Sequence, residues 1–367
     1  MTHLWVAIAA GAFAAVVALV AADRLRRRRD EAQAYLKGVR SIVSGDSDAT
    51  IEALSDAARL GSPEAVETYL ALGALFRRDG DLSRAVRLHR NMLLGPGLEP
   101  VRRTEVELEL AEDYRRSGML AEAAEIYERL APVSPTAAAG LREVRIEQGD
   151  LGAAAAIQRG LGGNGPDPIL AHLLAAAARA ALPADPARAA ALAQEGLAAC
   201  PASADAALAL AEAEGAAGRV AEALRAVERA LDQDPRSAAL AWPSLLAVPD
   251  RAAACALVAG RVLDRPEDAW LQLLQARALH RAGRDPEALV AARRAMELDR
   301  TGEVTLAMRE LLREADTPAP EDLAARHEIL VAALLRRGRA PRCGRCGADA
   351  PARSWRCRRC GAHDPYP

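Results

Sequence analysis

Aromatic residues and lysine are scarce in this chain. Phenylalanine, tyrosine and tryptophan together supply 3% of its 367 residues, although 51% are hydrophobic and alanine is abundant. A sheet with a bulky core needs large side chains, so this composition favours helices that pack closely through small ones. Lys37 is the only lysine, and we read the preference for arginine as a compositional bias without a mechanism. The net charge of −2 provides no overall attraction to nucleic acid.

Cysteine is too sparse for a disulfide scaffold, with six in the whole chain. Cys200 and Cys255 stand alone in alanine-rich helical sequence and are expected to be small buried core residues. The sequence shows no nucleophile paired with a base, no phosphate-binding loop and no paired-carboxylate site, so we expect a protein that is not an enzyme. We expect a structural or solvent-facing role for each histidine; these are His3, His89, His172, His280, His327 and His363.

An apolar run lies near the start of the sequence. From Leu4 to Ala22 it contains no charged residue, which is long enough for one helix to cross a bilayer. Arginines follow at positions 24 and 26–29, and none precedes the run. The positive-inside rule predicts a single-pass inner-membrane protein: residues 1–3 periplasmic, 4–22 a transmembrane helix, 23–49 a basic juxtamembrane linker, and the rest cytoplasmic. A cleaved signal peptide would carry its positive charges before the run, so we expect no cleavage.

Residues 50–315 repeat a pattern of small side chains. The clearest unit, Ala207 to Pro235, has small residues where two helices would cross, Gly218 between the helices, and a proline ending the second. The same small position recurs about every 34 residues, which is the tetratricopeptide period. Its alanines are Ala85, Ala123, Ala154, Ala189, Ala223, Ala254 and Ala288. We predict an all-α fold, a tetratricopeptide solenoid of about seven repeats whose groove binds partner proteins, unless some repeats serve only as spacers.

A breaker segment, Asp316 to Pro320, follows the repeats. Glu321 to Arg337 then carries an apolar stripe at helical spacing, so we predict a capping helix within residues 316–340. That helix would bring the last segment, residues 341–367, back onto the solenoid. This docking is a hypothesis that rests on the presence of Trp355 and on the lack of a flexible linker sequence.

The last segment contains two pairs of cysteines, each pair enclosing two residues and followed by Gly347 or Gly361. The four are Cys343, Cys346, Cys357 and Cys360. This spacing lets four sulfurs reach one tetrahedral ion, and the glycines permit turns that aim backbone N–H groups at sulfur. We therefore predict that these four cysteines bind one metal ion, and we call residues 341–367 the knuckle. Two disulfides or a redox-active dithiol are the alternatives.

The knuckle is too short to bury enough apolar surface to fold alone, so we expect the ion to supply much of its folding free energy. Four thiolates around a divalent ion carry a net charge of about −2, which the many arginines of this segment offset. The four thiolates also complete the coordination shell of the ion, so we expect neither catalysis at the ion nor ligation by His363. Trp355 is expected to form either the knuckle's own core or its docking face.

The succession of apolar run, arginine cluster, tetratricopeptide repeats and cysteine knuckle resembles the lipopolysaccharide assembly protein B (LapB, YciM) family. The most specific part covers Pro341 to Gly347 and Trp355 to Cys360, which look like that family's rubredoxin-like domain in spacing and tryptophan placement. The chain departs from the family at Ala348, where an aromatic residue is common, and at Arg358, where proline is usual. The resemblance implies that the four cysteines bind iron or zinc and that the domain packs against the repeats.

The resemblance also implies a non-enzymatic adaptor at the inner membrane. Members of the family restrain lipopolysaccharide synthesis by promoting proteolysis of the deacetylase LpxC by the membrane protease FtsH, and they contact lipopolysaccharide transport components. We therefore expect FtsH, LpxC and transport components as partners, with the groove and the knuckle holding the substrate. An anchor would raise the effective concentration of the repeats near a membrane-bound protease. The oligomeric state is left open, a homo-oligomer included.

Three other functions stay open at the level of sequence. The first is a tetratricopeptide scaffold for another envelope assembly. The second is electron transfer through a rubredoxin-like iron site. The third is nucleic-acid binding, since arginines are frequent from Arg336 to Arg359, although the expected anchor and the lack of interleaved aromatic residues argue against it.

Overall fold

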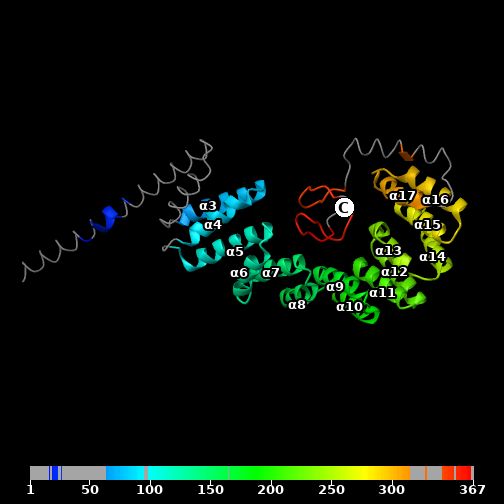
Figure 1. The fold of residues 1–367 in the computed structure, drawn as a ribbon, viewed down its shortest axis with the longest axis horizontal. Coiled ribbons are helices and arrows are strands. Elements are labelled where there is room, and N and C mark those ends of the chain that lie inside the picture. Colours follow the sequence, from blue (N-terminus) through cyan, green and yellow to red (C-terminus); the bar gives the residue numbers. More distant parts are fainter. Residues whose placement is uncertain are drawn as a thin grey trace, which may run out of the picture. The chain divides into compact units, whose positions relative to one another are not determined.

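The computed structural model contains two compact units, Met1–Gly149 and Asp150–Pro367 (Figure 1). The residues that it describes are 16, 19–23, 26, 63–94, 98–163, 165–314, 327–328, 341–350 and 353–364. Residues 1–3, and most of the predicted transmembrane helix 4–22, linker 23–49 and capping helix 316–340, lie outside this set, so those predictions stay predictions. Within the described part of the chain, no helix combines the length and the apolar character needed to cross a bilayer.

The first unit contains five described helices. They are α3 (Pro63–Asp79), α4 (Leu82–Leu93), α5 (Pro100–Arg116), α6 (Leu120–Leu130) and α7 (Pro135–Glu147). Each helix packs against the next one in sequence, α3 also contacts α5, and α5 contacts α7. Contacts between both first and second neighbours are typical of helical hairpins stacked side by side.

The second unit continues with the same kind of helices. They are α8 (Leu151–Leu161), α9 (Pro168–Ala181), α10 (Pro186–Ala199), α11 (Ala204–Ala216), α12 (Val220–Gln233), the 3₁₀ helix η1 (Pro235–Ala239), α13 (Trp242–Ala247), α14 (Arg251–Asp264), α15 (Ala269–Arg281), α16 (Asp285–Leu298) and α17 (Glu303–Glu314). Between α12 and α14 the regular helix is replaced by the two short pieces η1 and α13. The predicted all-helical, tetratricopeptide-like solenoid is confirmed for the described residues of each unit.

The alanines that mark the repeat all lie in the second helix of a predicted hairpin. Ala85, Ala123, Ala154, Ala189, Ala223, Ala254 and Ala288 belong to α4, α6, α8, α10, α12, α14 and α16, and each exposes between 0% and 5% of its surface. Gly73 shows how closely two such helices approach, because a Cβ added to it in α3 would lie 2.3 Å from Nε2 of His89 in α4. Small residues at these positions therefore allow the helices to pack in contact.

Glycines in the left-handed region follow the first helix of five hairpins. Gly80, Gly118, Gly149, Gly218 and Gly283 have φ between +75° and +88°. Glycine adopts this conformation readily because it has no Cβ, and a helix commonly ends on it. After α11, for example, the N–H of Arg219 donates to the carbonyl of Glu214 across the turn at 2.9 Å. The turn predicted at Gly218 is confirmed, and the same conformation recurs at the other four glycines.

Pro235, the proline predicted to end the second helix of the clearest unit, directly follows Asp234, the C-cap residue of α12, and it also begins the next element. Pro135 is the first residue of α7, and Pro235 is the first residue of η1. Proline suits the first helical turn because its fixed φ fits there and its missing N–H would have had no helical partner. Ser134 completes this start for α7, since its Oγ accepts a hydrogen bond from the N–H of Ala137 at 3.2 Å.

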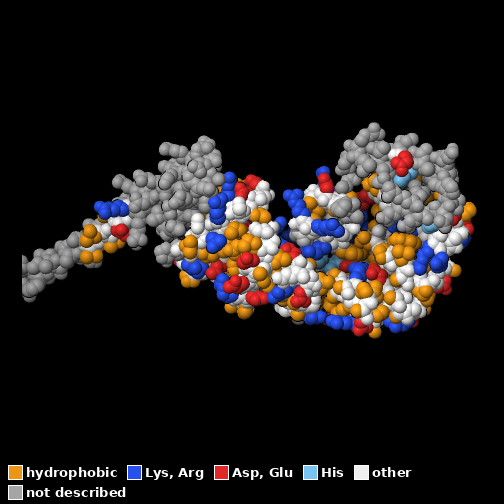
Figure 2. Space-filling view, viewed as in Figure 1, with side chains coloured by type: hydrophobic (Ala, Val, Ile, Leu, Met, Phe, Trp, Pro, Cys, Tyr) orange, Lys and Arg blue, Asp and Glu red, His pale blue; other side chains and the backbone are white. Residues whose placement is uncertain are grey.

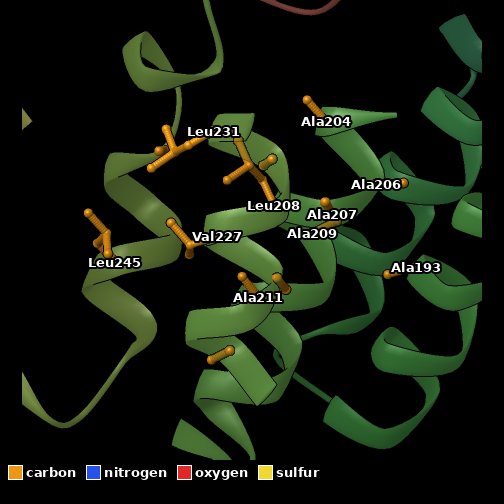
Figure 3. Close-up of a cluster of buried hydrophobic side chains, with 14 of the residues drawn as sticks. Ala193, Ala204, Ala206, Ala207, Leu208, Ala209, Ala211, Val227, Leu231 and Leu245 are labelled. Atoms are coloured by element: carbon orange, nitrogen blue, oxygen red, sulfur yellow. The ribbon is translucent and has the colours of Figure 1, made fainter. Parts of the chain in front are cut away.

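Helix α11 lies at the centre of a large buried cluster in the second unit. Leu208 of α11 is fully buried with Leu231 of α12 and Leu245 of α13 (Figure 3). Toward α10 the contact is made by small residues instead, since a Cβ on Gly196 would lie 3.2 Å from the Cβ of Ala206. The core thus consists of leucines on one side of the helix and alanine contacts on the other, which explains how it forms with few aromatic residues.

Arginines connect successive hairpins within each unit. In the first unit, Arg77 of α3 donates to Glu109 at 2.6 Å and to Asp113 at 2.7 Å, both in α5. In the second unit, Arg179 of α9 forms an ion pair with Asp205 of α11 at 2.7 Å. The planar fork of a guanidinium can serve two acceptors at once, which a lysine cannot do in the same way. The arginine bias therefore has a packing role that composition alone did not indicate.

Candidate metal centre

The knuckle consists of two halves with the same hydrogen-bond pattern. Each half closes its turn with two backbone hydrogen bonds of 2.8–2.9 Å. In the first half, the N–H of Cys343 donates to the carbonyl of Ala348, and the N–H of Gly347 donates to the carbonyl of Cys343. In the second half, the N–H of Cys357 donates to the carbonyl of Ala362, and the N–H of Gly361 donates to the carbonyl of Cys357. Gly347 and Gly361 have φ of 67° and 70°, so both take the left-handed conformation that the sequence predicted. An antiparallel bridge flanks each turn, between Arg342 and Asp349 and between Arg356 and His363.

The two turns bring the four predicted cysteines together. Their sulfurs all lie within 4.8 Å of one another. The Sγ atoms of Cys343 and Cys360 are 3.7 Å apart, and those of Cys346 and Cys357 are 3.8 Å apart. Four thiolates bound tetrahedrally to one ion at about 2.3 Å would lie about 3.8 Å from each other, so the donor set fits a single zinc or iron ion. The same separations are far longer than the bond of about 2.05 Å in a disulfide.

The backbone is arranged to stabilise negative charge on sulfur. The N–H groups of Cys346 and Arg345 donate to the sulfur of Cys343 and lower the pKa of its thiol to about 7. Burial, together with the neighbouring sulfurs, raises the pKa of the Cys360 thiol to about 12. Four sulfurs this close cannot all ionise unless a cation lies among them. A bound metal ion supplies that charge, and it binds the thiolate rather than the thiol form.

The two halves differ at the positions that contact the repeats. Pro341 and Ala350 of the first half are joined by a backbone bond of 2.8 Å, as Trp355 and Asp364 are in the second half at 2.9 Å. The tryptophan and the aspartate therefore occupy the same places in the second half as a proline and an alanine in the first. In the second half these side chains reach the helices of the second unit. The turns that carry the cysteines are shared by the halves, whereas the tryptophan and the aspartate that contact the helices occur in the second half.

Trp355 lies on the docking face of the knuckle. It packs against the buried cluster around α11, and its ring centroid is 5.7 Å from that of His172 in α9. His363 stacks on the same imidazole, with its centroid 5.0 Å from that of His172 and the two rings 18° apart. His363 thus contacts the repeats through His172. The hypothesis that the knuckle docks on the solenoid is confirmed within the second unit.

His172 is held between two carboxylates. Its Nδ1 lies 2.7 Å from Asp205 of α11 and its Nε2 lies 3.0 Å from Asp364 of the knuckle. Asp364 has φ of 45°, the only positive φ of a non-glycine residue among those described. Aspartate tolerates this left-handed conformation better than most residues, at some cost in strain. The unusual backbone therefore coincides with the side chain that joins the knuckle to α9.

The surroundings of His172 favour its charged form. Burial lowers its pKa, but the hydrogen bonds with Asp205 and Asp364 outweigh burial and raise the pKa to about 9. Asp205 is in turn paired with Arg179, and Arg179 also reaches Glu212 of α11 at 3.1 Å. A positive imidazole thus lies between a buried acid, Asp205, and a partly exposed one, Asp364, and it can form a charge-assisted hydrogen bond with each.

A second ion pair holds the knuckle near the other end of the unit. Arg353 Nε donates to Glu303 at 2.5 Å, and a second guanidinium nitrogen reaches the same carboxylate at 3.3 Å. Glu303 is the first residue of α17. The knuckle therefore contacts both α9 and α17. Figure 1 shows these as an early and a late helix of the second unit. A groove of about 360 Å³ opens beside it, lined by His172, Ser203, Gln233, Trp355 and Asp364 among others.

Sequence reasoning singled out the four cysteines and Trp355, and it missed the other docking residues, His172, Arg353 and Asp364. Cys200 and Cys255 are buried, with 7% and 6% exposed, as expected for core positions. His172 was expected to have a structural or solvent role, and the structure shows it as the main polar contact between α9 and the knuckle. The available signal was a single ionisable residue in the otherwise apolar start of α9, Pro-Ile-Leu-Ala-His-Leu-Leu. That signal identifies a special position but not its partner.

No family model matches the chain. Lipopolysaccharide assembly protein B of Escherichia coli strain K12 is 28% identical over 109 residues, which make up 29% of this chain and 28% of that protein. The protein of the same name from Escherichia coli O157:H7 matches to the same extent. The chain thus spans under a third of the length of these curated relatives. The chain therefore combines a partial similarity to lipopolysaccharide assembly protein B with a helical repeat fold and a cluster of four cysteines.

Solved tetratricopeptide proteins also resemble the chain. A tetratricopeptide repeat protein from Parabacteroides merdae is 19% identical, with a TM-score of 0.40, over 68% of this chain and 97% of that one. The TPR2AB domain of yeast Sti1 is 15% identical, with a TM-score of 0.27, over 81% and 98% of the two chains. At these scores the comparison adds nothing to what the helices of each unit show by themselves.

Proposed function

We propose that this chain is a membrane-anchored cytoplasmic adaptor that regulates lipopolysaccharide biosynthesis. In this proposal the helical repeats and the knuckle hold LpxC for proteolysis by FtsH at the inner membrane and also meet lipopolysaccharide transport components. The partial likeness to lipopolysaccharide assembly protein B supports the proposal. The main observation behind the proposal is that the knuckle docks on helical repeats, because stacked helical repeats commonly provide a protein-binding surface. The proposal includes no catalytic centre.

The residues of the chain would supply binding and positioning. A zinc or iron ion bound by Cys343, Cys346, Cys357 and Cys360 supplies folding free energy to the knuckle. Trp355, Asp364 and Arg353 then hold the folded knuckle on α9 and α17 through the contacts described above. A surface fixed in this way loses little conformational entropy when a partner binds, which favours affinity.

Deletion of the gene in its own host tests the proposal. We expect LpxC and lipopolysaccharide levels to rise and to return to normal with a copy of the wild-type gene. A copy with Cys343→Ser and Cys357→Ser should fail to restore them, whereas a copy with Cys200→Ser, which leaves the four clustered cysteines intact, should restore them. Unchanged LpxC and lipopolysaccharide levels after deletion would refute the proposal.

A scaffold for a different envelope assembly is the second candidate. It is favoured by the short extent of the likeness, 29% of the chain, and by Ala348 and Arg358, where the family pattern differs. Crosslinking from positions in the groove beside the knuckle, in intact membranes, distinguishes the two candidates. Capture of LpxC or FtsH supports the first, and capture of other envelope proteins without them supports the second. Metal analysis tests electron transfer, because zinc has no redox chemistry.

A further inference from the structure

The docked knuckle has a free face made of arginine-bearing loops. Its contacts with the repeats use Arg353, Trp355, His363 and Asp364, as described above. The residues between the cysteines of each pair are instead exposed: Gly344 and Arg345 in the first half, Arg358 and Arg359 in the second. Positive side chains gather over the knuckle in the space-filling view (Figure 2). Docking therefore leaves the apices of both metal-binding loops open to other molecules.

The free face is positively charged even when the ion site is taken into account. A divalent ion with four thiolates contributes about −2. The arginines of residues 341–364 outweigh that charge and the two acids; they are Arg342, Arg345, Arg353, Arg356, Arg358 and Arg359 against Asp349 and Asp364. Arg342 is paired with Asp349, and Arg353 with Glu303. Within the residues that the structure describes, neither Arg345 nor Arg358 forms an ion pair, so their guanidinium groups are available.

The loops that carry these arginines are firmly held. Each lies between two cysteines of the cluster and is closed by the turn bonds of Gly347 and Gly361 described above. Because the sulfurs of both pairs lie within 4.8 Å of one another, the two loops are brought side by side around one point. Guanidinium groups on such a base recognise carboxylates with two parallel hydrogen bonds.

We propose that the exposed arginine loops of the knuckle bind a carboxylate-rich segment of a partner protein. A nucleic acid would be expected to stack on aromatic side chains, but Trp355 faces the repeats. A membrane surface is typically bound by clusters of about four to eight basic residues, and the loops carry only Arg345, Arg358 and Arg359. An extended acidic peptide needs neither. The inference deepens the proposed adaptor role and names the chemistry of the partner at this face.

Binding of a labelled peptide tests the inference. The probe is a fluorescein-labelled decapeptide of alternating glutamate and glycine, added to the full-length, metal-loaded chain, with anisotropy read at low and moderate salt. The variant is Arg345→Gln with Arg358→Gln. The matched control is Arg188→Gln with Arg300→Gln, which removes the same charge from exposed positions of the same unit. Losing two guanidinium–carboxylate pairs should weaken binding about tenfold or more, whereas the control should change it less than about twofold.

A further variant, Arg345→Lys with Arg358→Lys, keeps the charge and should retain part of the affinity. Metal content and unfolding of every variant are measured, so that loss of the knuckle is recognised as such. Equal losses in the glutamine variant and the control would overturn the inference, as would no measurable binding by the wild type. Tighter binding to phosphatidylglycerol vesicles or to a decanucleotide than to the peptide would also overturn it. Unchanged LpxC after gene deletion would refute the proposed function and leave peptide binding untouched.

Discussion

The contact between His172 and Asp364 offers a quantitative test of how the knuckle is held. The substitution Asp364→Asn keeps the shape of the side chain and tolerates the left-handed backbone at φ 45°, but it removes the negative charge. His172 exposes 7% of its surface and would retain Asp205 as its other partner. The change therefore weakens a partly buried, charge-assisted contact without opening a cavity.

The size of the effect follows from the pKa of His172. A rise from 6.5 to about 9 corresponds to roughly 3 kcal/mol of preference for the charged form in the folded state. Asp205 and Asp364 share this contribution, and the Asp364 side chain is 43% exposed, so solvent screens its part. We expect Asp364→Asn to lower the free energy of unfolding by about 1 kcal/mol at pH 6.5.

The contact also predicts the direction of pH dependence. The folded-state pKa of His172 is raised, so its stabilisation is complete below pH 6.5, the unfolded value, and is lost as the pH rises through about 9. The groups facing the imidazole are Asp205, Asp364 and the ring of His363, with Arg179 behind Asp205. Wild-type protein should thus be less stable at pH 9.5 than at pH 6.5, and the difference should shrink in Asp364→Asn.

Urea unfolding of the full-length, metal-loaded chain at these two pH values measures the effect, with hydrogen exchange of residues 353–364 reporting on the knuckle itself. Asp349→Asn is the matched control, because Asp349 pairs with Arg342 inside the knuckle and is 53% exposed. We expect the control to change stability by less than about 0.5 kcal/mol. If both variants unfold at the same urea concentration at pH 6.5, the reasoning is wrong.

Three further predictions concern packing and metal. Gly73→Ala should destabilise the first unit by about 1–3 kcal/mol in thermal unfolding, because the new Cβ would meet the ring of His89 at 2.3 Å. The helical control Gly160→Ala, whose new Cβ would have nothing within 4 Å, should be neutral or stabilising in the same assay. Leu208→Ala should lower the free energy of unfolding of the second unit by about 2–5 kcal/mol in urea, and a loss below about 1 kcal/mol would contradict its place in the core. Elemental analysis should find one ion per wild-type chain and much less in Cys357→Ser; a full complement in the variant would exclude the tetrathiolate site.

The repeats and the cysteine cluster were predictable because their signals are local. Ala85 and Ala223 mark helix crossings, and a crossing tolerates only a small side chain whatever its neighbours are. Gly218 and Gly347 mark turns that require a left-handed conformation. The spacing of Cys357 and Cys360 likewise determines by itself whether two sulfurs can share an ion. None of these features depends on knowing which distant helix lies opposite.

The docking of the knuckle was only partly predictable, because its partners are far apart in sequence. Asp364 meets His172 across 192 positions, and Arg353 meets Glu303 across 50. Trp355 indicated that the knuckle had a face to bury, but no local pattern shows which helix receives it. The role of Pro135 depends on its surroundings in a related way. A proline between two helices fits either the end of one or the start of the next, and the N-cap of Ser134 assigns Pro135 to the start of α7.

The long interval between His172 and Asp364 has a consequence for synthesis. The hairpin of α9 and α10 leaves the ribosome well before the knuckle, so the nascent chain can stack its helices while His172 has only Asp205 as a partner. Contacts between such distant positions form late and slowly in folding. Capture of the ion and closure onto α9 would then follow the stacking of the helices, and chains stalled before these steps would present the bare surface of α9 to chaperones and proteases.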